Sequence, residues 1–169
     1  MGVALRSSSL ADVEQVRLWR NEVLEALRTP FRLTQEMQAD FYANTVCNRA
    51  ADSRWWSVYD GSLFIGLAGL CNIQWENGLA EISLIIDPEK RGKGYGVQAV
   101  DAVLAEGFGN LGLDTIYGEC YECNPALGFW DRMVGRRGGY TTMLPRRKRW
   151  QGKLYDSLYF AFCYEEVDG

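Results

Sequence analysis

Histidine is missing from all 169 residues of the sequence, and this absence excludes several kinds of active site. Serine–histidine and cysteine–histidine catalysis need an imidazole base, and most zinc and non-haem iron sites need histidine ligands. We therefore expect no metal centre. Proline is scarce, with four residues, and neither a repeat nor a linker rich in proline or serine divides the chain. Residues 1–169 are predicted to form a single domain.

Long apolar runs are also missing. No stretch approaches the roughly 18 apolar residues that a membrane-spanning helix needs, and residues 1–6 lack the features of a signal peptide. We therefore expect a cytoplasmic protein with no membrane partner. The five cysteines include one CxxC pair, Cys120 and Cys123, without the second pair that a structural zinc site needs. The thiols are predicted to be reduced and mostly buried.

Charge is unevenly distributed along the chain. The net charge is −4, but residues 132–153 carry eight basic residues and no acidic one, which leaves ten basic and 22 acidic residues elsewhere. This asymmetry indicates either an anionic partner or a solvated basic hairpin that ends near Gln151 and Gly152. Trp150 is the only aromatic residue beside the basic run at residues 146–149. We therefore do not expect a nucleic-acid partner.

Hydrophobic spacing predicts the element order β-α-α-β-β-β-α-β-α-β-β, which is a mixed α/β sheet. Ser9 and Asp12 are typical of a capping box, and the helix that they begin is predicted to end at Thr29 and Pro30. A second helix is expected from about Thr34 to residue 46. The other strands and helices are predicted over residues 3–5, 55–59, 63–75, 80–86, 97–108, 115–120, 126–134, 140–144 and 155–164.

The most informative segment follows the strand that ends at Ile86. Residues 91–97 read Arg-Gly-Lys-Gly-Tyr-Gly-Val and stand at the expected start of a helix. Amide groups at a helix start have no partner within the helix, and the helix dipole adds partial positive charge there. The segment therefore predicts a cradle for a phosphate or pyrophosphate. It lacks the Gly-Lys-Ser/Thr of a P-loop, and Val97 breaks the dinucleotide pattern GxGxxG.

Because Arg91, Gly94 and Gly96 form an Arg-x-x-Gly-x-Gly pattern, the chain resembles the GNAT superfamily of acetyl-CoA-dependent N-acetyltransferases over nearly its whole length. The resemblance implies a mixed, mostly antiparallel central sheet of about seven strands flanked by about four helices. It also implies that a strand backbone pairs with the pantetheine arm of acetyl-CoA, that the glycine-rich amides hold its pyrophosphate, and that Asn124 reaches the pantetheine. The cofactor-binding residues implied in this way are Leu84, Ile85, Ile86, Arg91, Gly92, Lys93, Gly94, Tyr95, Gly96, Val97, Asn124 and Trp130.

Two side chains are candidate catalytic groups, Glu81 and Tyr121. A primary amine is only about one part in a thousand neutral at pH 7, so its acetylation needs a base. The resemblance places a frequent family base at Glu81, and the alternative is a strand-edge glutamate paired with a basic neighbour. Near the position where the family has a tyrosine acid the chain has Trp130, whose indole cannot serve as that acid. Tyr121, Tyr95 or water are the candidates to replace it.

The predicted reaction is direct transfer of the acetyl group to a primary amine of a small molecule, such as an amino sugar or a nucleotide-linked amine. Residues 18–21 and 149–156 resemble the branch that contains ribosomal-protein N-terminal and amino-sugar acetyltransferases. The alternatives are acetylation of a protein N-terminus or lysine, and a catalytically silent acyl-CoA-binding module. We expect a monomer or homodimer. Five tryptophans are predicted to line the acceptor pocket or to pack in the core: Trp19, Trp55, Trp56, Trp75 and Trp150.

Overall fold

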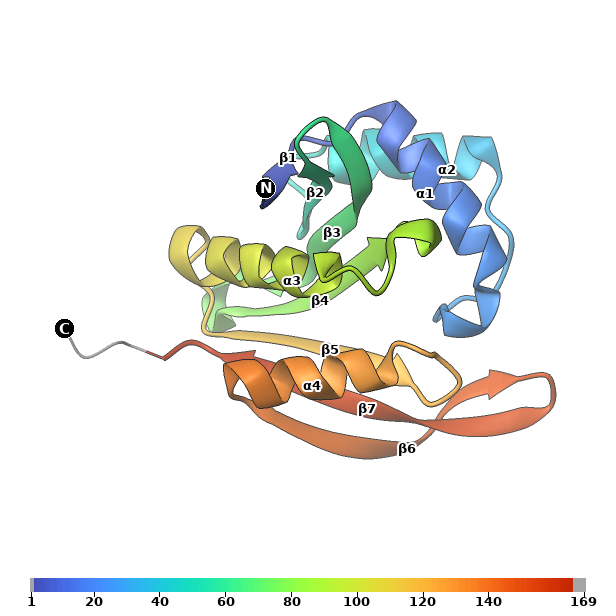
Figure 1. Cartoon of the computed structure of the whole chain (residues 1–169), viewed down its shortest axis with the longest axis vertical. Coiled ribbons are helices and arrows are strands. Elements are labelled where there is room, and N and C mark those ends of the chain that lie inside the picture. Colours follow the sequence, from blue (N-terminus) through green and yellow to red (C-terminus); the bar gives the residue numbers. More distant parts are fainter. Residues whose placement is uncertain (1, 166–169) are drawn as a thin grey trace.

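A seven-stranded sheet runs through the computed structural model, which describes residues 2–165 (Figure 1). Its strands and the α-helices between them follow the predicted order. They are β1 (Val3–Arg6), α1 (Leu10–Glu22), α2 (Gln35–Phe41), β2 (Arg54–Asp60), β3 (Leu63–Gln74), β4 (Leu79–Ile86), α3 (Tyr95–Ala105), β5 (Thr115–Tyr121), α4 (Leu127–Arg137), β6 (Tyr140–Trp150) and β7 (Lys153–Cys163).

The strands lie in the order β1-β2-β3-β4-β5-β7-β6. Neighbours are antiparallel except β4 and β5, which are parallel. Parallel strands need a crossover connection, and α3 supplies it here. The mixed, mostly antiparallel sheet predicted from the sequence is therefore confirmed.

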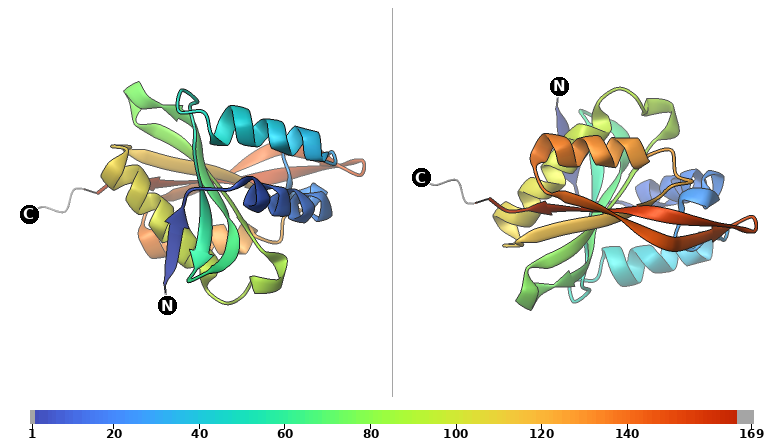
Figure 2. Two further views of the ribbon diagram at one scale, coloured as in Figure 1. Left: turned by 90° about the horizontal axis from the view of Figure 1, so that it is seen from above. Right: turned by 90° about the horizontal axis from the view of Figure 1, so that it is seen from below.

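Helices cover both faces of the sheet, with α1 and α2 on one side and α3 and α4 on the other (Figure 2). The strand sequences show why both faces are apolar, since alternate residues of a strand point to opposite faces. On β4, Ala80 and Ile82 face the large core under α3 and α4. Ile85 faces the smaller cluster around Val16 and Trp19 on α1.

The start of α1 is as predicted, but its end is not. Ser9 Oγ accepts a hydrogen bond from the Asp12 amide, and the Asp12 carboxylate accepts one from the Ser9 amide, which completes the capping box. The helix stops at Glu22, seven residues before Thr29, and a short 3-10 turn, Leu24–Ala26, follows. The predicted extension to Thr29 and Pro30 was wrong, because tertiary contacts turn the chain back.

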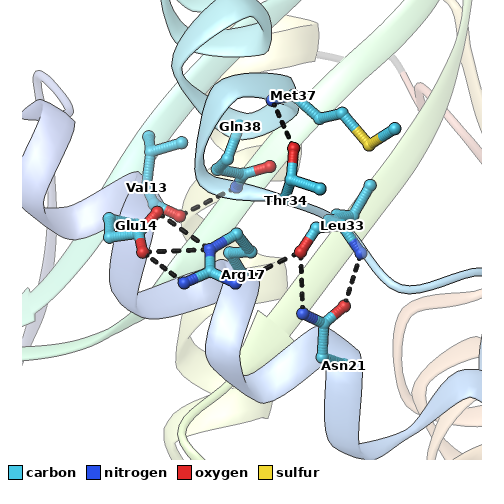
Figure 3. Close-up of polar contacts among 8 residues, drawn as sticks. All are labelled: Val13, Glu14, Arg17, Asn21, Leu33, Thr34, Met37 and Gln38. Carbon is cyan, nitrogen blue, oxygen red and sulfur yellow. Dashed lines mark hydrogen bonds and ion pairs between the residues drawn. The ribbon is translucent and has the colours of Figure 1, made fainter.

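Those contacts join the end of α1 to the start of α2 (Figure 3). The Asn21 side chain bonds both backbone groups of Leu33, donating to its oxygen at 3.0 Å and accepting from its nitrogen at 2.8 Å. Gln38 on α2 donates to the Val13 oxygen on α1 at 2.8 Å. Thr34 caps α2, as the sequence predicted. The connection over residues 23–33 is therefore a loop with both ends fixed.

The C-terminal hairpin is longer than predicted and extends past the rest of the sheet (Figure 2). The turn at Gln151 and Gly152 is confirmed, and both residues have positive φ. The basic run at residues 146–149 lies within β6 rather than in a loop. A bulge interrupts β6 between Leu144 and Lys148, with Arg146 at φ 56°.

The five cysteines differ in their burial. All five cysteines are free, but only Cys120 is buried, so the prediction of mostly buried thiols was wrong. Burial raises the pKa of the Cys120 thiol to about 12, which keeps it protonated at neutral pH.

Within residues 2–165, no group of histidine, cysteine, aspartate or glutamate side chains is arranged to hold a metal ion. None of the helices described there is long and apolar enough to cross a membrane.

Candidate active site

The two parallel strands at the centre of the sheet separate after a short contact. The ladder between β4 and β5 contains three residue pairs and ends where Glu81 pairs with Tyr117. Beyond this point the strands diverge, as Figure 1 shows on the right of the view. The sheet therefore has a gap, open at one end, between the second half of β4 and the second half of β5.

The edge of β4 that borders this gap has free backbone groups. The Asp87 amide donates to the Ile65 oxygen at 2.8 Å, and alternate residues of an antiparallel ladder bond the same neighbour. Ser83 and Ile85 therefore point their backbone groups toward β3. The intervening residues, Ile82, Leu84 and Ile86, point theirs into the gap. Of the three predicted cofactor-binding residues on this strand, Leu84 and Ile86 face the gap.

The glycine-rich segment lies at the open end of this gap. Gly92 and Gly94 have φ values of 75° and 83°, and Gly94 is the N-cap of α3. The first backbone hydrogen bond of α3 runs from the Gln98 amide to the Gly94 oxygen. The amides of Tyr95, Gly96 and Val97 therefore have no acceptor within the helix. Apart from the adjoining residues, no atom would lie within 4 Å of a Cβ at Gly92 or Gly94. Arg91 and Lys93 are exposed beside them.

Asn124 follows β5 on the other side of the same opening. The start of α4 lies at this end of the gap, as does the start of α3 (Figure 1). The Asn124 amide donates to the Tyr121 oxygen at 2.8 Å, and its Oδ1 accepts from the Ala126 amide at 2.9 Å. The side chain therefore holds the turn that leads into α4.

These features fit acetyl-CoA, the group that the sequence resemblance implies. The free edge of β4 offers alternating donors and acceptors to an extended amide-containing arm. The left-handed glycines and the free amides of α3 form an open space whose partial positive charge would suit a diphosphate. The predicted binding residues on β4 and α3 therefore meet at one opening.

A pocket of about 500 Å³ lies on the sheet face that carries Glu81, beside the last pair of the β4–β5 ladder. A cavity of this size suits a small molecule. The residues that line it come from β4, β5, β6 and β7 and from the connection between α1 and α2. Its lining residues are Arg28, Glu81, Tyr117, Glu119, Tyr121, Leu144, Arg147 and Tyr159.

Glu81 is held by two neighbours. Arg28 Nη2 lies 2.6 Å from Glu81 Oε1, and Asn72 Nδ2 donates to Oε2 at 3.0 Å. The Glu81 side chain is 13% exposed, whereas the Arg28 side chain is 57% exposed. The hydrogen bond to Glu81 raises the pKa of Arg28. The basic neighbour considered for Glu81 is therefore present, and it stands in the pocket itself.

A second ion pair lines the pocket. Glu119 Oε1 accepts from Arg147 Nε at 2.8 Å and from Ser157 Oγ at 2.7 Å, and Oε2 accepts from Arg147 Nη2 at 3.3 Å. The hydrogen bond from Arg147 holds the pKa of Glu119 below its usual value. Arg147 reaches this face because the bulge in β6 interrupts the alternation of side chains.

Tyr121 and Tyr95, the two candidate acids, occupy different places. Tyr121 is buried and lines the pocket with Glu81. Lys148 Nζ lies 5.2 Å from the centre of its ring. Tyr95, the first residue of α3, donates from its hydroxyl to Asp60 Oδ2 at 2.9 Å. This bond raises the pKa of Tyr95, so its proton is less available than that of a free phenol.

Trp130 packs in the core. Its ring stacks on Phe160 with a centroid distance of 4.5 Å and meets Phe129 edge to face at 5.0 Å. This packing accounts for the tryptophan without a ligand contact. The other five tryptophans are absent from the pocket lining. Trp19, for example, stacks on Phe64 at 5.5 Å.

Six of the eight pocket residues were missed as site residues in the sequence. Tyr117 and Glu119 could have been found, because they alternate with the predicted residue Tyr121 along β5 and must therefore point to the same face of the sheet. Arg28 had no such signal, because it lies 53 positions from Glu81. Arg147 was included only in the basic run, and its direction depends on the bulge.

Comparisons with known proteins agree with this geometry. The family model of the acetyltransferase (GNAT) domain matches residues 3–128. No curated protein sequence matches the chain.

Solved structures of similar fold include a spermidine N-acetyltransferase from Vibrio cholerae in complex with CoA and spermine. The TM-score is 0.83 at 20% identity, covering 95% of each chain. A chimera of the Vibrio cholerae spermidine N-acetyltransferase with hSSAT gives 0.83 at 21% identity, covering 96% of each chain. The matched domain includes the three-pair ladder, the gap and the glycine-rich start of α3. The chain belongs to the GNAT family of acetyl-CoA-dependent acetyltransferases.

Proposed function

We propose that the protein transfers the acetyl group of acetyl-CoA to a primary amine of a small molecule. One observation carries the proposal: Glu81 stands at the last pair of the β4–β5 ladder, between the free edge of β4 and a pocket of about 500 Å³. The carboxylate therefore lines the pocket in which an amine would bind and lies next to the gap that fits the cofactor.

Three residues, Glu81, Ile86 and Tyr121, would act on the reacting groups. When bound, acetyl-CoA supplies the thioester carbonyl that the amine attacks directly in a ternary complex. Glu81 takes the proton from the amine, directly or through water. The Ile86 amide, which points into the gap, polarises the carbonyl. Tyr121 is the candidate acid because, of the three tyrosines that line the pocket, it is the one predicted as catalytic from the sequence.

The proposed acceptor is a small amine such as an amino sugar or a nucleotide-linked amine. The size of the pocket supports a small molecule over a protein N-terminus or lysine. Spermidine and spermine are named for the similar structures at 20–21% identity, and they form the comparison class for any acceptor assay. Four further expectations remain predictions. They are membership of the ribosomal-protein and amino-sugar branch, a single domain over residues 1–169, a cytoplasmic location, and a monomeric or homodimeric state.

Thermal unfolding with and without acetyl-CoA tests the cofactor site. A ligand at 100 times its Kd adds about 2.7 kcal/mol of stability, which is several degrees of Tm for a chain of this size. We expect this shift in the natural protein and its loss in Gly94→Glu, which puts a carboxylate into the cradle. A Tm unchanged at millimolar acetyl-CoA would overturn the proposal.

Glu81→Gln separates an enzyme from a silent acyl-CoA-binding module. We expect a fall in kcat of at least about 100-fold with the best amine of a panel, because the base is removed. The shift in Tm with acetyl-CoA should remain. Glu76→Gln, at an exposed position after β3, is the matched control. Equal rates for the two variants would remove Glu81 from the mechanism.

A further inference from the structure

The pocket beside Glu81 carries balanced charge. Its lining contains two carboxylates and two guanidinium groups, arranged as the pairs Arg28–Glu81 and Arg147–Glu119. A polyamine brings only positive charge, and in this pocket it would meet two arginines and two carboxylates that already have partners. An acceptor that brings charge of both signs would match the lining better.

The two ion pairs differ in the number of hydrogen bonds between arginine and carboxylate. Glu119 accepts three hydrogen bonds, two from Arg147 and one from Ser157. Glu81 accepts two hydrogen bonds, one from Asn72 and only one from Arg28, whose side chain is 57% exposed. Exposed ion pairs with one contact are weak. Arg28 therefore needs to break only one hydrogen bond to exchange Glu81 for another anion, and Glu81 keeps its bond from Asn72, whereas Arg147 holds Glu119 through two bonds.

Both guanidinium groups keep donors for a ligand. Among residues 2–165, the hydrogen bonds to carboxylates use only Nη2 of Arg28 and Nε and Nη2 of Arg147, so Nη1 of neither group bonds a carboxylate. Arginine binds carboxylates and phosphates through two donors at once. The Arg147 side chain is 48% exposed, which leaves it open to an anion in the pocket.

The loop that carries Arg28 is fixed in place. Asn21 bonds both backbone groups of Leu33 at its far end (Figure 3). Nearer the pocket, the buried Lys148 donates to the Leu27 oxygen, and the Cys123 thiol donates to the Glu25 oxygen at 3.4 Å. The backbone beside Arg28 is thus anchored to β6 and to the end of β5. Its guanidinium is presented to the pocket even when it leaves Glu81.

We propose that the acceptor is an amine that also carries an anionic group, a carboxylate or a phosphate, and that Arg28 and Arg147 bind this group. The inference rests on the proposed function. On binding, the anion of the acceptor replaces Glu81 as the partner of Arg28. Glu81 Oε1 is then free to accept the proton of the ammonium group. The same contact that selects the acceptor therefore releases the base.

Matched amines test the proposal. The phosphate arm compares glucosamine 6-phosphate with glucosamine, and the carboxylate arm compares 4-aminobutyrate with 1,4-diaminobutane, with spermidine as a further polyamine. We expect kcat/KM to be roughly tenfold or more higher for the anionic member of at least one pair, because a hydrogen-bonded ion pair contributes that much. Equal or higher kcat/KM for the neutral amine and both polyamines would overturn the proposal.

Arginine variants identify the groups responsible. Arg28→Gln should lower the preference for the anionic amine by roughly tenfold and raise the rate with the neutral amine, because Glu81 loses its internal partner. Arg147→Lys keeps the charge but loses the planar guanidinium that holds Glu119 through Nε and Nη2 and leaves Nη1 for the anion, and it should lower the preference as well. Arg149→Gln, exposed on the same hairpin, is the control. A preference that survives both pocket variants would contradict the assignment.

Calorimetry keeps this inference separate from the proposed function. Glucosamine 6-phosphate and glucosamine are titrated into protein saturated with CoA, so no turnover is needed. Tighter binding of the phosphate, lost in Arg28→Gln, supports the anion site even if no amine of the panel is acetylated. Equal affinities would overturn the inference while leaving acetyl-CoA binding and turnover of neutral amines intact.

Discussion

Trp130 stands near the position of the acid that the family resemblance leads one to expect, but its ring is in the core between Phe129 and Phe160. A tyrosine there would bury its hydroxyl in the same apolar packing and point no acid at a thioester. We therefore expect Trp130→Tyr to leave kcat unchanged and to lower the free energy of unfolding by about 1–3 kcal/mol. Tyr121→Phe should lower kcat instead. Rate measurements and urea unfolding of both variants check this, and a faster Trp130→Tyr enzyme would contradict it.

Glu119 should make stability depend on pH. Its pKa is lowered by the hydrogen bond from Arg147, so the folded protein holds the ionised form more strongly than the unfolded chain does. The contribution is complete above the unfolded value of 4.5 and is lost as the pH falls through the lower folded value. We expect Glu119→Gln to cost about 1 kcal/mol at pH 7 and less at pH 3. Urea unfolding at the two pH values measures this, and a cost that stays constant between them would exclude the linkage.

At the scale of a single element, β4 separates two kinds of backbone amide. Those of Ser83 and Ile85 bond β3, and those of Leu84 and Ile86 face the gap. In the free protein, amide exchange measured by NMR should therefore alternate along the strand, fast at Leu84 and Ile86 and slow between them. With acetyl-CoA at 100 times its Kd, the two fast amides should slow by up to about 100-fold. Uniform exchange along β4 in both states would contradict the pairing.

The elements best predicted from the sequence are those whose signal is local. The alternation on β4, the capping box at Ser9 and the glycines before α3 each use neighbouring residues only. The end of α1 could not be predicted, because it depends on Asn21 reaching Leu33. The same reason hid Arg28 from the candidate site. Contacts between distant residues need the fold, since propensity and spacing contain no information about them.

At the scale of the whole molecule, the charge asymmetry of the sequence is partly used internally. Within residues 132–153, Arg136 and Arg137 pair with Asp101 on α3, and Arg147 pairs with Glu119. Lys148 is buried against the Leu27 oxygen. The basic segment therefore attaches the hairpin and α4 to the rest of the fold. Its surface is less positive than its composition suggests.

The same segment forms one of the two edges of the sheet, since β6 is the last strand and has a neighbour on one side only. The other edge, β1, is four residues long. A long edge strand invites pairing with another molecule. We expect the triple variant Pro145→Val, Arg146→Thr and Arg149→Thr, which flattens β6 and removes two of its four positive charges, to self-associate at concentrations where the natural protein does not. Light scattering against concentration measures this, with Lys153→Thr on the paired strand β7 as the control.

The bulge at Arg146 thus has a second consequence. Because Pro145 has no backbone N–H donor and the positive φ of Arg146 twists the strand, β6 cannot offer a regular row of hydrogen-bonding groups to an incoming strand. The irregularity that turns Arg147 toward the pocket is therefore also expected to oppose pairing of this edge with another strand, so the pocket lining and the resistance of the edge to pairing depend on the same few residues.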